Sequence, residues 1–195
     1  MCIRDSFKDI LSSIATKVDT FYINKNEHYR ANSPVETRED RFISWLLKKY
    51  PAHNVAKSNP ILQRQRSIKH PDEIDQIKKA CDITRRGFNR VLKFIKPSVW
   101  EYEIEAEFIH EFINNSSKGF AYSPIIASGN DNNVLHYIKN NKQCKSGELI
   151  LMDVGAEYGN YSSDMTRTIP VSGKFSKRQK AVSYTHLTLP TNREV

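Results

Sequence analysis

The sequence is poor in cysteine and lacks long apolar runs. Only three of its 195 residues are cysteines, Cys2, Cys81 and Cys144, and no two of them have CxxC spacing. An odd, sparse set of this kind argues against a disulfide framework and predicts a protein of a reducing compartment, the cytoplasm. No apolar run approaches the roughly 20 residues that a membrane-spanning helix needs. We therefore expect neither a disulfide-stabilised fold nor a membrane partner.

The charge balance is basic, but no block of one sign stands out. The formal net charge is +8 at pH 7, with 38% hydrophobic and 27% charged residues, which is ordinary for a globular protein. The lysines and arginines are spread over amphipathic segments and do not form the stripe that a nucleic-acid-binding surface presents. A nucleic-acid partner is therefore not expected.

The two ends of the sequence share a coding relationship. The first five residues, Met-Cys-Ile-Arg-Asp, can be encoded by ATG TGT ATA AGA GAC, and its reverse complement, GTC TCT TAT ACA CAT, encodes residues 182–186. One short DNA element, similar to the transposon end used to fragment DNA for sequencing, explains both. We interpret residues 1–6 and 182–195 as adapter-derived, and 7–181 as an internal piece of a longer protein. Residues 183–195 are then expected to be irregular or loosely attached.

Residues 7–66 are predicted to be the end of a small α/β unit. A short β-prone run covers residues 20–23. Apolar residues at helical spacing fill residues 39–50, and Pro51 ends that helix. Nothing in this unit indicates chemistry.

Residues 67–181 differ in character and begin with two amphipathic helices. The first is predicted from Pro71 to Ile95, because apolar residues recur there at three- and four-residue steps, and Cys81 is expected on its buried face. A capping pattern at Ser98–Glu101 opens the second helix. Its buried side is expected to carry Tyr102, Ala106, Ile109 and Ile113.

From Phe120 onward the pattern is typical of β structure, so the predicted fold class is α+β. Gly159-Asn160 is expected to be a two-residue hairpin turn. The expected strands cover residues 122–127, 134–137, 148–157 and 161–171.

The expected hairpin brings two acidic residues together. Asp153 stands inside the apolar run 149–155, and aspartate in a buried strand is costly unless it is paired or binds a cation. With a two-residue turn at Gly159-Asn160, Asp153 faces Thr166, and Asp164 lies two positions along the partner strand on the same face. Diagonal neighbours of this kind are roughly 7–8 Å apart, close enough to hold metal ions. A one-residue slip would put the two carboxylates on opposite faces.

The same residues also permit a purely structural interpretation. Asp153 could cap a turn, and Asp164 could pair with Arg167. His136 lies on the expected strand 134–137, and a single histidine of this kind is more often a satisfied core residue than a catalytic one.

Taken in order, these segments resemble the Xaa-Pro aminopeptidases of the pita-bread metallopeptidases. The motifs that carry the resemblance are Ser128-Gly129, Val134-Leu135-His136-Tyr137, Met152-Asp153-Val154-Gly155-Ala156-Glu157-Tyr158, Ser163-Asp164-Met165-Thr166-Arg167-Thr168 and Pro170-Val171-Ser172-Gly173-Lys174-Phe175. The resemblance covers residues 67–181, and it weakens before them. It implies the first half of a pita-bread (creatinase/aminopeptidase) fold, preceded by the end of a small α/β N-terminal domain.

The resemblance also implies a chemistry for three residues. Asp153 and Asp164 match two acidic ligands of a dinuclear centre, usually of manganese, so the implied cofactors are two divalent metal ions, Mn²⁺ first among them. His136 matches the histidine that contacts substrate and helps to stabilise the tetrahedral intermediate. The implied substrate is a peptide with proline in second position, whose N-terminal residue is released. The oligomeric state of the parent protein, possible homo-oligomers included, is left open.

After Asp164 the sequence departs from this family. The family takes a further metal-binding histidine, two glutamates and additional histidines from downstream segments. The only histidine and carboxylate after Asp164 are His186 and Glu194, both in the adapter-derived end. The parent protein is therefore expected to be an enzyme, and the 195-residue chain to be inactive.

Two other functions stay open for the parent protein. The nearest is a prolidase, which cleaves only dipeptides and is similar in the same stretches. The other is a non-catalytic pita-bread module that binds peptides. His136, Asp153 and Asp164 together argue against that module, because binding alone does not require buried carboxylates.

Overall fold

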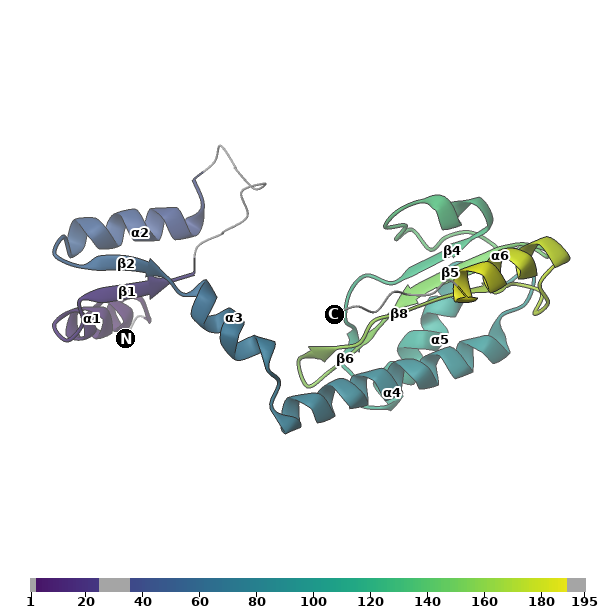
Figure 1. Ribbon diagram of the computed structural model, residues 1–195, viewed down its shortest axis with the longest axis horizontal. Coiled ribbons are helices and arrows are strands. Elements are labelled where there is room, and N and C mark those ends of the chain that lie inside the picture. The colour runs from purple at the N-terminus through teal and green to yellow at the C-terminus, as the bar shows by residue number, and fades with distance from the viewer. Residues whose placement is uncertain (1–2, 25–35, 189–195) are drawn as a thin grey trace. The chain divides into compact units, whose positions relative to one another are not determined.

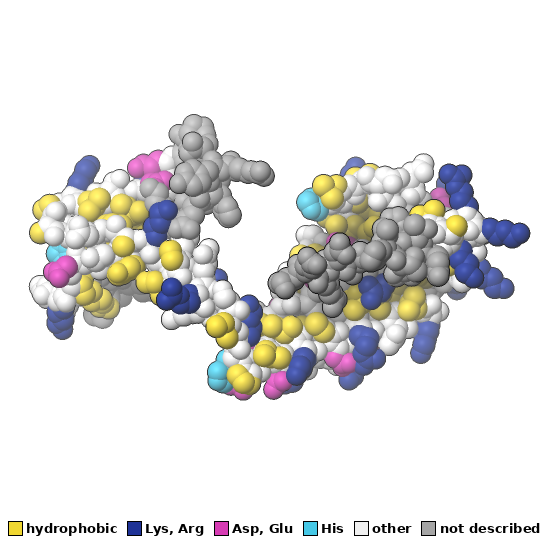
Figure 2. Space-filling model, viewed as in Figure 1, with side chains coloured by type: hydrophobic (Ala, Val, Ile, Leu, Met, Phe, Trp, Pro, Cys, Tyr) yellow, Lys and Arg dark blue, Asp and Glu magenta, His cyan; other side chains and the backbone are white. Residues whose placement is uncertain are grey.

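The computed structural model describes residues 3–24 and 36–188 (Figure 1). They form two compact units that divide between Lys69 and His70. Every helix in these described ranges is too short or too polar to cross a bilayer. On the face shown in Figure 2, Lys and Arg side chains stand in several separate places.

The first unit pairs two short parallel strands with helices. Its elements are α1 (Ile3–Ala15), β1 (Thr20–Ile23), α2 (Arg38–Lys49), β2 (Asn54–Lys57) and α3 (Asn59–Ser67). Helix α2 begins at a capping box, because the Thr37 hydroxyl accepts from the backbone N–H of Asp40 and the Asp40 carboxylate accepts from that of Thr37. It ends before Pro51, as predicted. The predicted strand at residues 20–23 is also confirmed.

The second unit begins with two helices that pack on each other, α4 (Pro71–Phe94) and α5 (Glu101–Asn114). Pro71 supplies a preset φ at the first helical position, and acidic residues follow in the first turn. Gly87 allows the helices to approach closely, since a Cβ there would lie 2.7 Å from the ring of Phe112 and 2.9 Å from that of Phe108.

Six short strands of the second unit form two three-stranded antiparallel sheets. The first has the order β4-β5-β8 and the second β3-β6-β7. The strands are β3 (Gly119–Phe120), β4 (Ile125–Ser128), β5 (Leu149–Val154), β6 (Ala156–Tyr158), β7 (Tyr161–Ser162) and β8 (Met165–Pro170). A 3-10 helix at Gly129–Asn133 follows β4, and α6 (Lys177–Thr188) follows β8.

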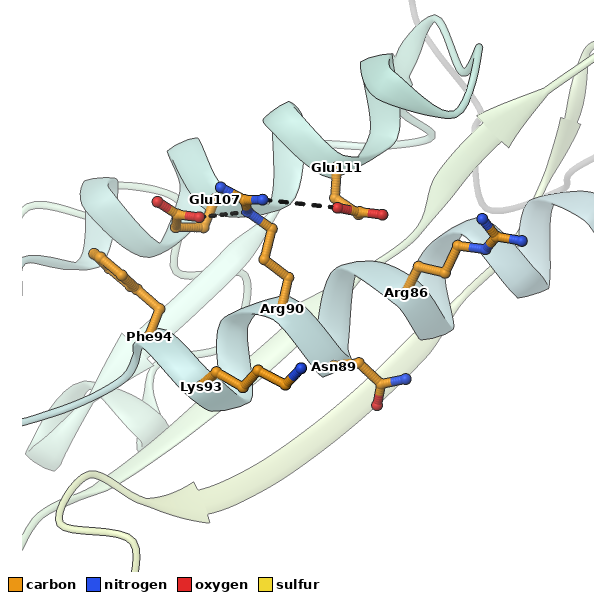
Figure 3. A pocket seen from close by; sticks show the side chains of 7 residues that line it. All are labelled: Arg86, Asn89, Arg90, Lys93, Phe94, Glu107 and Glu111. Carbon is orange, nitrogen blue, oxygen red and sulfur yellow. Dashed lines mark hydrogen bonds and ion pairs between the residues drawn. The ribbon is translucent and has the colours of Figure 1, made fainter.

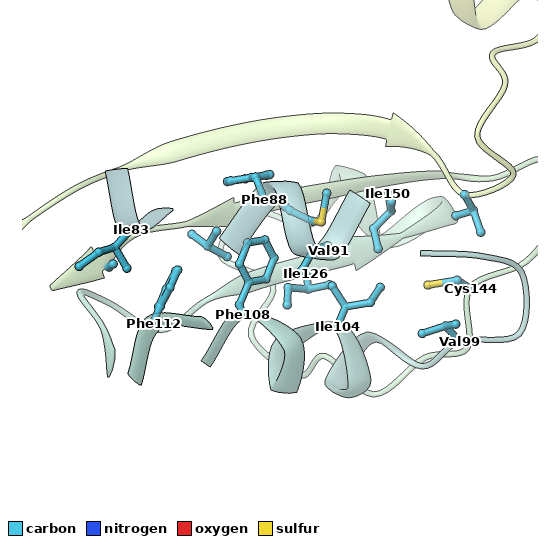
Figure 4. Close-up of a cluster of buried hydrophobic side chains, with 14 residues drawn as sticks. Ile83, Phe88, Val91, Val99, Ile104, Phe108, Phe112, Ile126, Cys144 and Ile150 are labelled. Carbon is cyan, nitrogen blue, oxygen red and sulfur yellow. The ribbon is translucent and has the colours of Figure 1, made fainter. Parts of the chain in front are cut away.

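The core lies between the two helices and one face of the sheets (Figure 4). Strand β5 shows the division of faces, because Ile150, Met152 and Val154 are fully buried whereas the alternate residues, Asp153 among them, are half-buried. Fourteen buried residues form the core cluster: Ile83, Phe88, Val91, Val99, Ile104, Phe108, Phe112, Ile126, Cys144, Ile150, Met152, Val154, Ala156 and Val171.

The predicted buried side of α5 is wrong. Tyr102 and Ile113 are 51% and 61% exposed, whereas Ile104, Phe108 and Phe112 are fully buried. Both stripes are apolar at helical spacing, and only packing against α4 selects between them. The buried placement of Cys81 is wrong for a similar reason, since Ala80, Ile83 and Thr84 take the inner positions of α4 and leave Cys81 exposed.

The predicted cap of α5 is also wrong. Ser98 does not cap α5: it has φ +75°, and the N-cap is Trp100, whose N–H donates to the Glu103 carboxylate. Residues 183–195 were expected to be irregular or loosely attached, and as far as Thr188 they are not irregular, because α6 continues to that residue. Residues 189–195 lie outside the described part of the chain. Val182, within α6, is 55% exposed.

The correction to α5 can be tested by two truncations on the same helix. Phe108→Ala is expected to lower the free energy of unfolding by about 3–5 kcal/mol, because a fully buried ring leaves a cavity. Ile113→Ala is expected to change it by no more than about 0.5 kcal/mol. Urea unfolding followed by Trp100 fluorescence in a Trp45→Phe background reports on the second unit alone. A larger loss for Ile113→Ala than for Phe108→Ala would show that the side of α5 predicted from the sequence is the buried one.

Candidate metal centre

The hairpin register places Asp153 and Asp164 as predicted from the turn. Tyr158 pairs with Tyr161 across Gly159-Asn160, and further along the hairpin Asp153 pairs with Thr166. The same register on both sides of the strand break sets Asp164 opposite Gly155, two positions from Thr166. Asp164 was expected within a continuous strand over residues 161–171. It lies instead in the short break between β7 and β8.

Hydrogen bonds to α4 hold this break in place. The Ser163 hydroxyl lies 2.6 Å from that of Thr84 on α4, and both lie about 3 Å from the backbone N–H of Ala156. The Ser163 N–H donates to the Ala156 carbonyl at 3.0 Å. Gly155 permits the crossing of the two chains, because a Cβ at that position would stand 1.8 Å from the Ser163 carbonyl oxygen. The position of Asp164 is therefore set by backbone that cannot shift freely.

One tyrosine hydroxyl joins the two carboxylates. The Tyr122 hydroxyl donates to Asp153 Oδ1 at 2.8 Å and to Asp164 Oδ1 at 2.9 Å. Because a hydroxyl has a single proton, the two acceptors share it. Burial, and then these two carboxylates, raise the pKa of Tyr122 above its ordinary value. The two carboxylates therefore stand side by side, with only one proton between them to offset their repulsion.

Tyr122 was not singled out by the sequence. It lies in the connection between β3 and β4, where a continuous strand over residues 122–127 was predicted. Its contacts reach residues 31 and 42 positions away. No local pattern carries such a signal, because the contact exists only once both sheets have formed.

His136 lies in a turn and not on a strand. The expected strand at residues 134–137 is wrong: this stretch follows the 3-10 helix, and His136 has φ +56° in the left-handed region. Its side chain is exposed. Within the described residues, no hydrogen bond or ion pair joins His136 to Asp153 or Asp164. The structure thus brings the two carboxylates together and leaves the histidine on a separate loop.

The donor set suits a hard divalent cation in part. Asp153 is half-buried and Asp164 exposed, so their free oxygens are open to solvent. Carboxylate oxygens are the ligands preferred by Mg²⁺ and Mn²⁺. Among the described residues no third His, Cys, Asp or Glu completes a cluster with them. The carboxylate pair therefore fits a metal ion as a partial ligand set.

A separate cavity of about 750 Å³ lies between α4 and α5 (Figure 3). Arg90 pairs there with Glu107 and, at 3.9 Å, with Glu111. Arg86, which also lines the cavity, contacts Asp82 and Asn115. Both arginines are thus paired, and neither aspartate of the carboxylate pair lines this cavity.

The sequence profile of metallopeptidase family M24 matches residues 75–188, more than half of the chain and the part that contains both aspartates. The chain belongs to this family of metallopeptidases.

Relatives with known sequences carry a more particular name. The Xaa-Pro aminopeptidase of Haemophilus influenzae is 38% identical over 123 residues, which are 63% of this chain and 29% of that protein. Human Xaa-Pro aminopeptidase 3 is 40% identical over 119 residues, 61% of this chain and 24% of that protein. The chain thus spans less than a third of the length of these relatives.

Solved structures show the same fold. Proline aminopeptidase P II from Yersinia pestis has a TM-score of 0.80 at 28% identity and covers 93% of this chain, which in turn covers 42% of it. Zinc-substituted Escherichia coli aminopeptidase P in complex with product gives the same TM-score, identity and coverage. The predicted α+β fold, part of a pita-bread fold, is confirmed by this likeness.

The close approach at Gly155 predicts a sharp difference between two glycine substitutions. Gly155→Ala is expected to lower the free energy of unfolding of the second unit by about 3 kcal/mol or more, because backbone must move. Gly147 has φ +83° but open space around it. Gly147→Ala should therefore lower the free energy of unfolding by only about 1–2 kcal/mol, through backbone strain alone. Urea unfolding followed by Trp100 fluorescence measures both variants. Equal effects would show that the crossing at Gly155 is not tight.

Proposed function

We propose that the parent protein is a metal-dependent aminopeptidase that releases the N-terminal residue from peptides with proline in second position. The observation that carries the proposal is the convergence of Asp153 and Asp164 on one hydroxyl, at 2.8 and 2.9 Å. Two carboxylates this close together and open to solvent contribute little to the stability of the fold, since only a single shared proton offsets their mutual repulsion. A bound cation would offset it fully.

In this proposal Asp153 and Asp164 hold divalent metal ions, two in number and manganese by preference. When bound, such ions lower the pKa of a water and polarise the scissile carbonyl. Tyr122 fixes the orientation of both carboxylates, and Thr84 and Ser163 fix the backbone that carries Asp164. His136 contacts the substrate from its exposed turn. The remaining ligands and the general base are expected from downstream segments of the parent protein.

The proposal includes the partner of the protein and its cellular compartment. Its partner is the peptide substrate, with no nucleic acid or membrane involved. Cys81 and Cys144 are free thiols, which supports a reducing compartment such as the cytoplasm. Burial raises the pKa of the Cys144 thiol to about 11, so that thiol stays protonated at neutral pH.

The activity is best tested on a full-length parent protein recovered from the source DNA. With Mn²⁺ present, release of the first residue from a peptide with proline second is expected, with loss on chelation. Asp153→Ala should lower kcat/KM by at least about 100-fold, more than loss of a typical outer-shell partner. Asp75→Ala, which removes an exposed carboxylate paired with Lys78 on α4, should leave it unchanged. Cleavage confined to dipeptides would indicate a prolidase instead, and no cleavage at all a binding module.

The 195-residue chain offers an independent test of metal binding. It is expected to show no turnover, but to bind Mn²⁺ weakly through its two carboxylates. Paramagnetic broadening in ¹H–¹⁵N spectra should concentrate at the amides around residues 153 and 164. Asp153→Asn should abolish this local broadening, and Asp75→Asn should preserve it. Broadening that persists in the Asp153→Asn variant would contradict the proposal that Asp153 binds the metal ion.

A further inference from the structure

Glu101, the first residue of α5, is a fully buried carboxylate outside the candidate metal centre. A charge in such a position is costly unless hydrogen bonds satisfy it, although the helix N-terminus favours a negative charge. The sequence assigns it no role beyond a place in the expected capping pattern at Ser98–Glu101. Its hydrogen bonds therefore indicate what it holds.

Within the described part of the chain, the hydrogen bonds to the Glu101 carboxylate all come from one segment, residues 128–142. Oε1 accepts from the backbone N–H of Ser128 at 2.8 Å and from its hydroxyl at 2.7 Å. Oε2 accepts from the Tyr137 hydroxyl at 2.8 Å and from the backbone N–H of Lys142 at 3.0 Å. The carboxylate thus fastens the start, the middle and the end of the segment that carries His136.

This segment needs an external anchor because its backbone is strained. His136 has φ +56° and Asn140 φ +43°, values that non-glycine residues adopt at a cost of about 1–3 kcal/mol each. Asn140 has its own anchor: its side chain accepts from the Ile126 N–H and donates to the Pro124 carbonyl, both at 3.0 Å. His136 has no such bond among the described residues. Its neighbour Tyr137 provides the attachment.

Tyr137 and His136 divide anchoring and exposure between them. The Tyr137 side chain is only 6% exposed, with its hydroxyl on Glu101, while His136 is exposed. Burial and the contact with Glu101 raise the pKa of Tyr137, so its hydroxyl stays a donor over the whole neutral range. The turn is therefore held at its buried residue and presents the adjacent histidine to solvent.

We propose that Glu101 and Tyr137 are positioning residues that set the His136 turn for contact with the peptide substrate. The inference rests on the proposed function, in which His136 contacts substrate. Neither residue touches the metal ligands, so the effect is expected on substrate and transition-state binding and not on metal content. A misplacement of about 1 Å at such a position can cost about 100-fold in rate.

The test is a double-mutant cycle in the full-length parent protein. Tyr137→Phe keeps the ring and removes only the hydroxyl, and it is expected to lower kcat/KM by about 10- to 100-fold with bound manganese unchanged. In the His136→Ala background the same substitution should have no further effect, since the group that it positions is absent. Tyr102→Phe, on the exposed side of α5, is the matched control and should be silent. Additive losses in the cycle would overturn the proposal and leave a purely structural role.

A second measurement separates this inference from the proposed function. In the 195-residue chain, Tyr137→Phe and Glu101→Gln should both raise amide hydrogen exchange over residues 134–142, while exchange in β5 stays unchanged. Unchanged exchange over 134–142 would overturn the positioning role whatever the enzyme does. A full-length protein without peptidase activity, combined with raised exchange, would instead refute the proposed function and the substrate contact of His136 that the inference requires.

Discussion

The close crossing of two backbones at Gly155 and Ser163 is the constraint on which the rest of the site depends. Because Gly155 has no side chain, the Ser163 carbonyl oxygen can lie 1.8 Å from the point where a Cβ of residue 155 would stand. The register therefore stays the same on both sides of the break, while the chain passes from the sheet β3-β6-β7 to the sheet β4-β5-β8. Thr84 ties this crossing to α4. Asp164 stands beside Asp153 because its neighbour is held in this way.

Three carboxylates of the second unit differ in how many hydrogen bonds satisfy them. Glu101 is fully buried and accepts four hydrogen bonds, so its oxygens have little capacity left for a cation. Asp153 and Asp164 share one hydroxyl and keep oxygens open to solvent. The first arrangement stabilises a loop, and the second leaves two neighbouring carboxylates with one shared donor. The number of donors around a carboxylate thus decides how far its charge is satisfied within the protein.

Sequence reasoning succeeded where the deciding interactions are local. The two-residue turn at Gly159-Asn160 determines the pairing of its neighbours, and alternation along the strand then carries that register to Asp153. Helix α4 was predicted within a residue because its start depends on Pro71 and its end on the approach of Pro97. Sequence reasoning failed where the local pattern was compatible with two different structures. Helix α5 has two apolar stripes, and the segment around His136 has a β-prone composition although it forms a turn.

By itself, the sequence determined the α+β class, the hairpin register and the meeting of Asp153 with Asp164, because turn residues and strand alternation act over a few positions. Only the tertiary structure decided which stripe of α5 is buried, since that choice depends on the shape of α4 at Gly87. It also decided that Tyr122 bridges the aspartates and that Glu101 holds the turn of His136. These contacts join residues 27 to 42 positions apart. Separations of this length leave no periodic trace in a sequence, because the residues become neighbours only after the helices and sheets have packed.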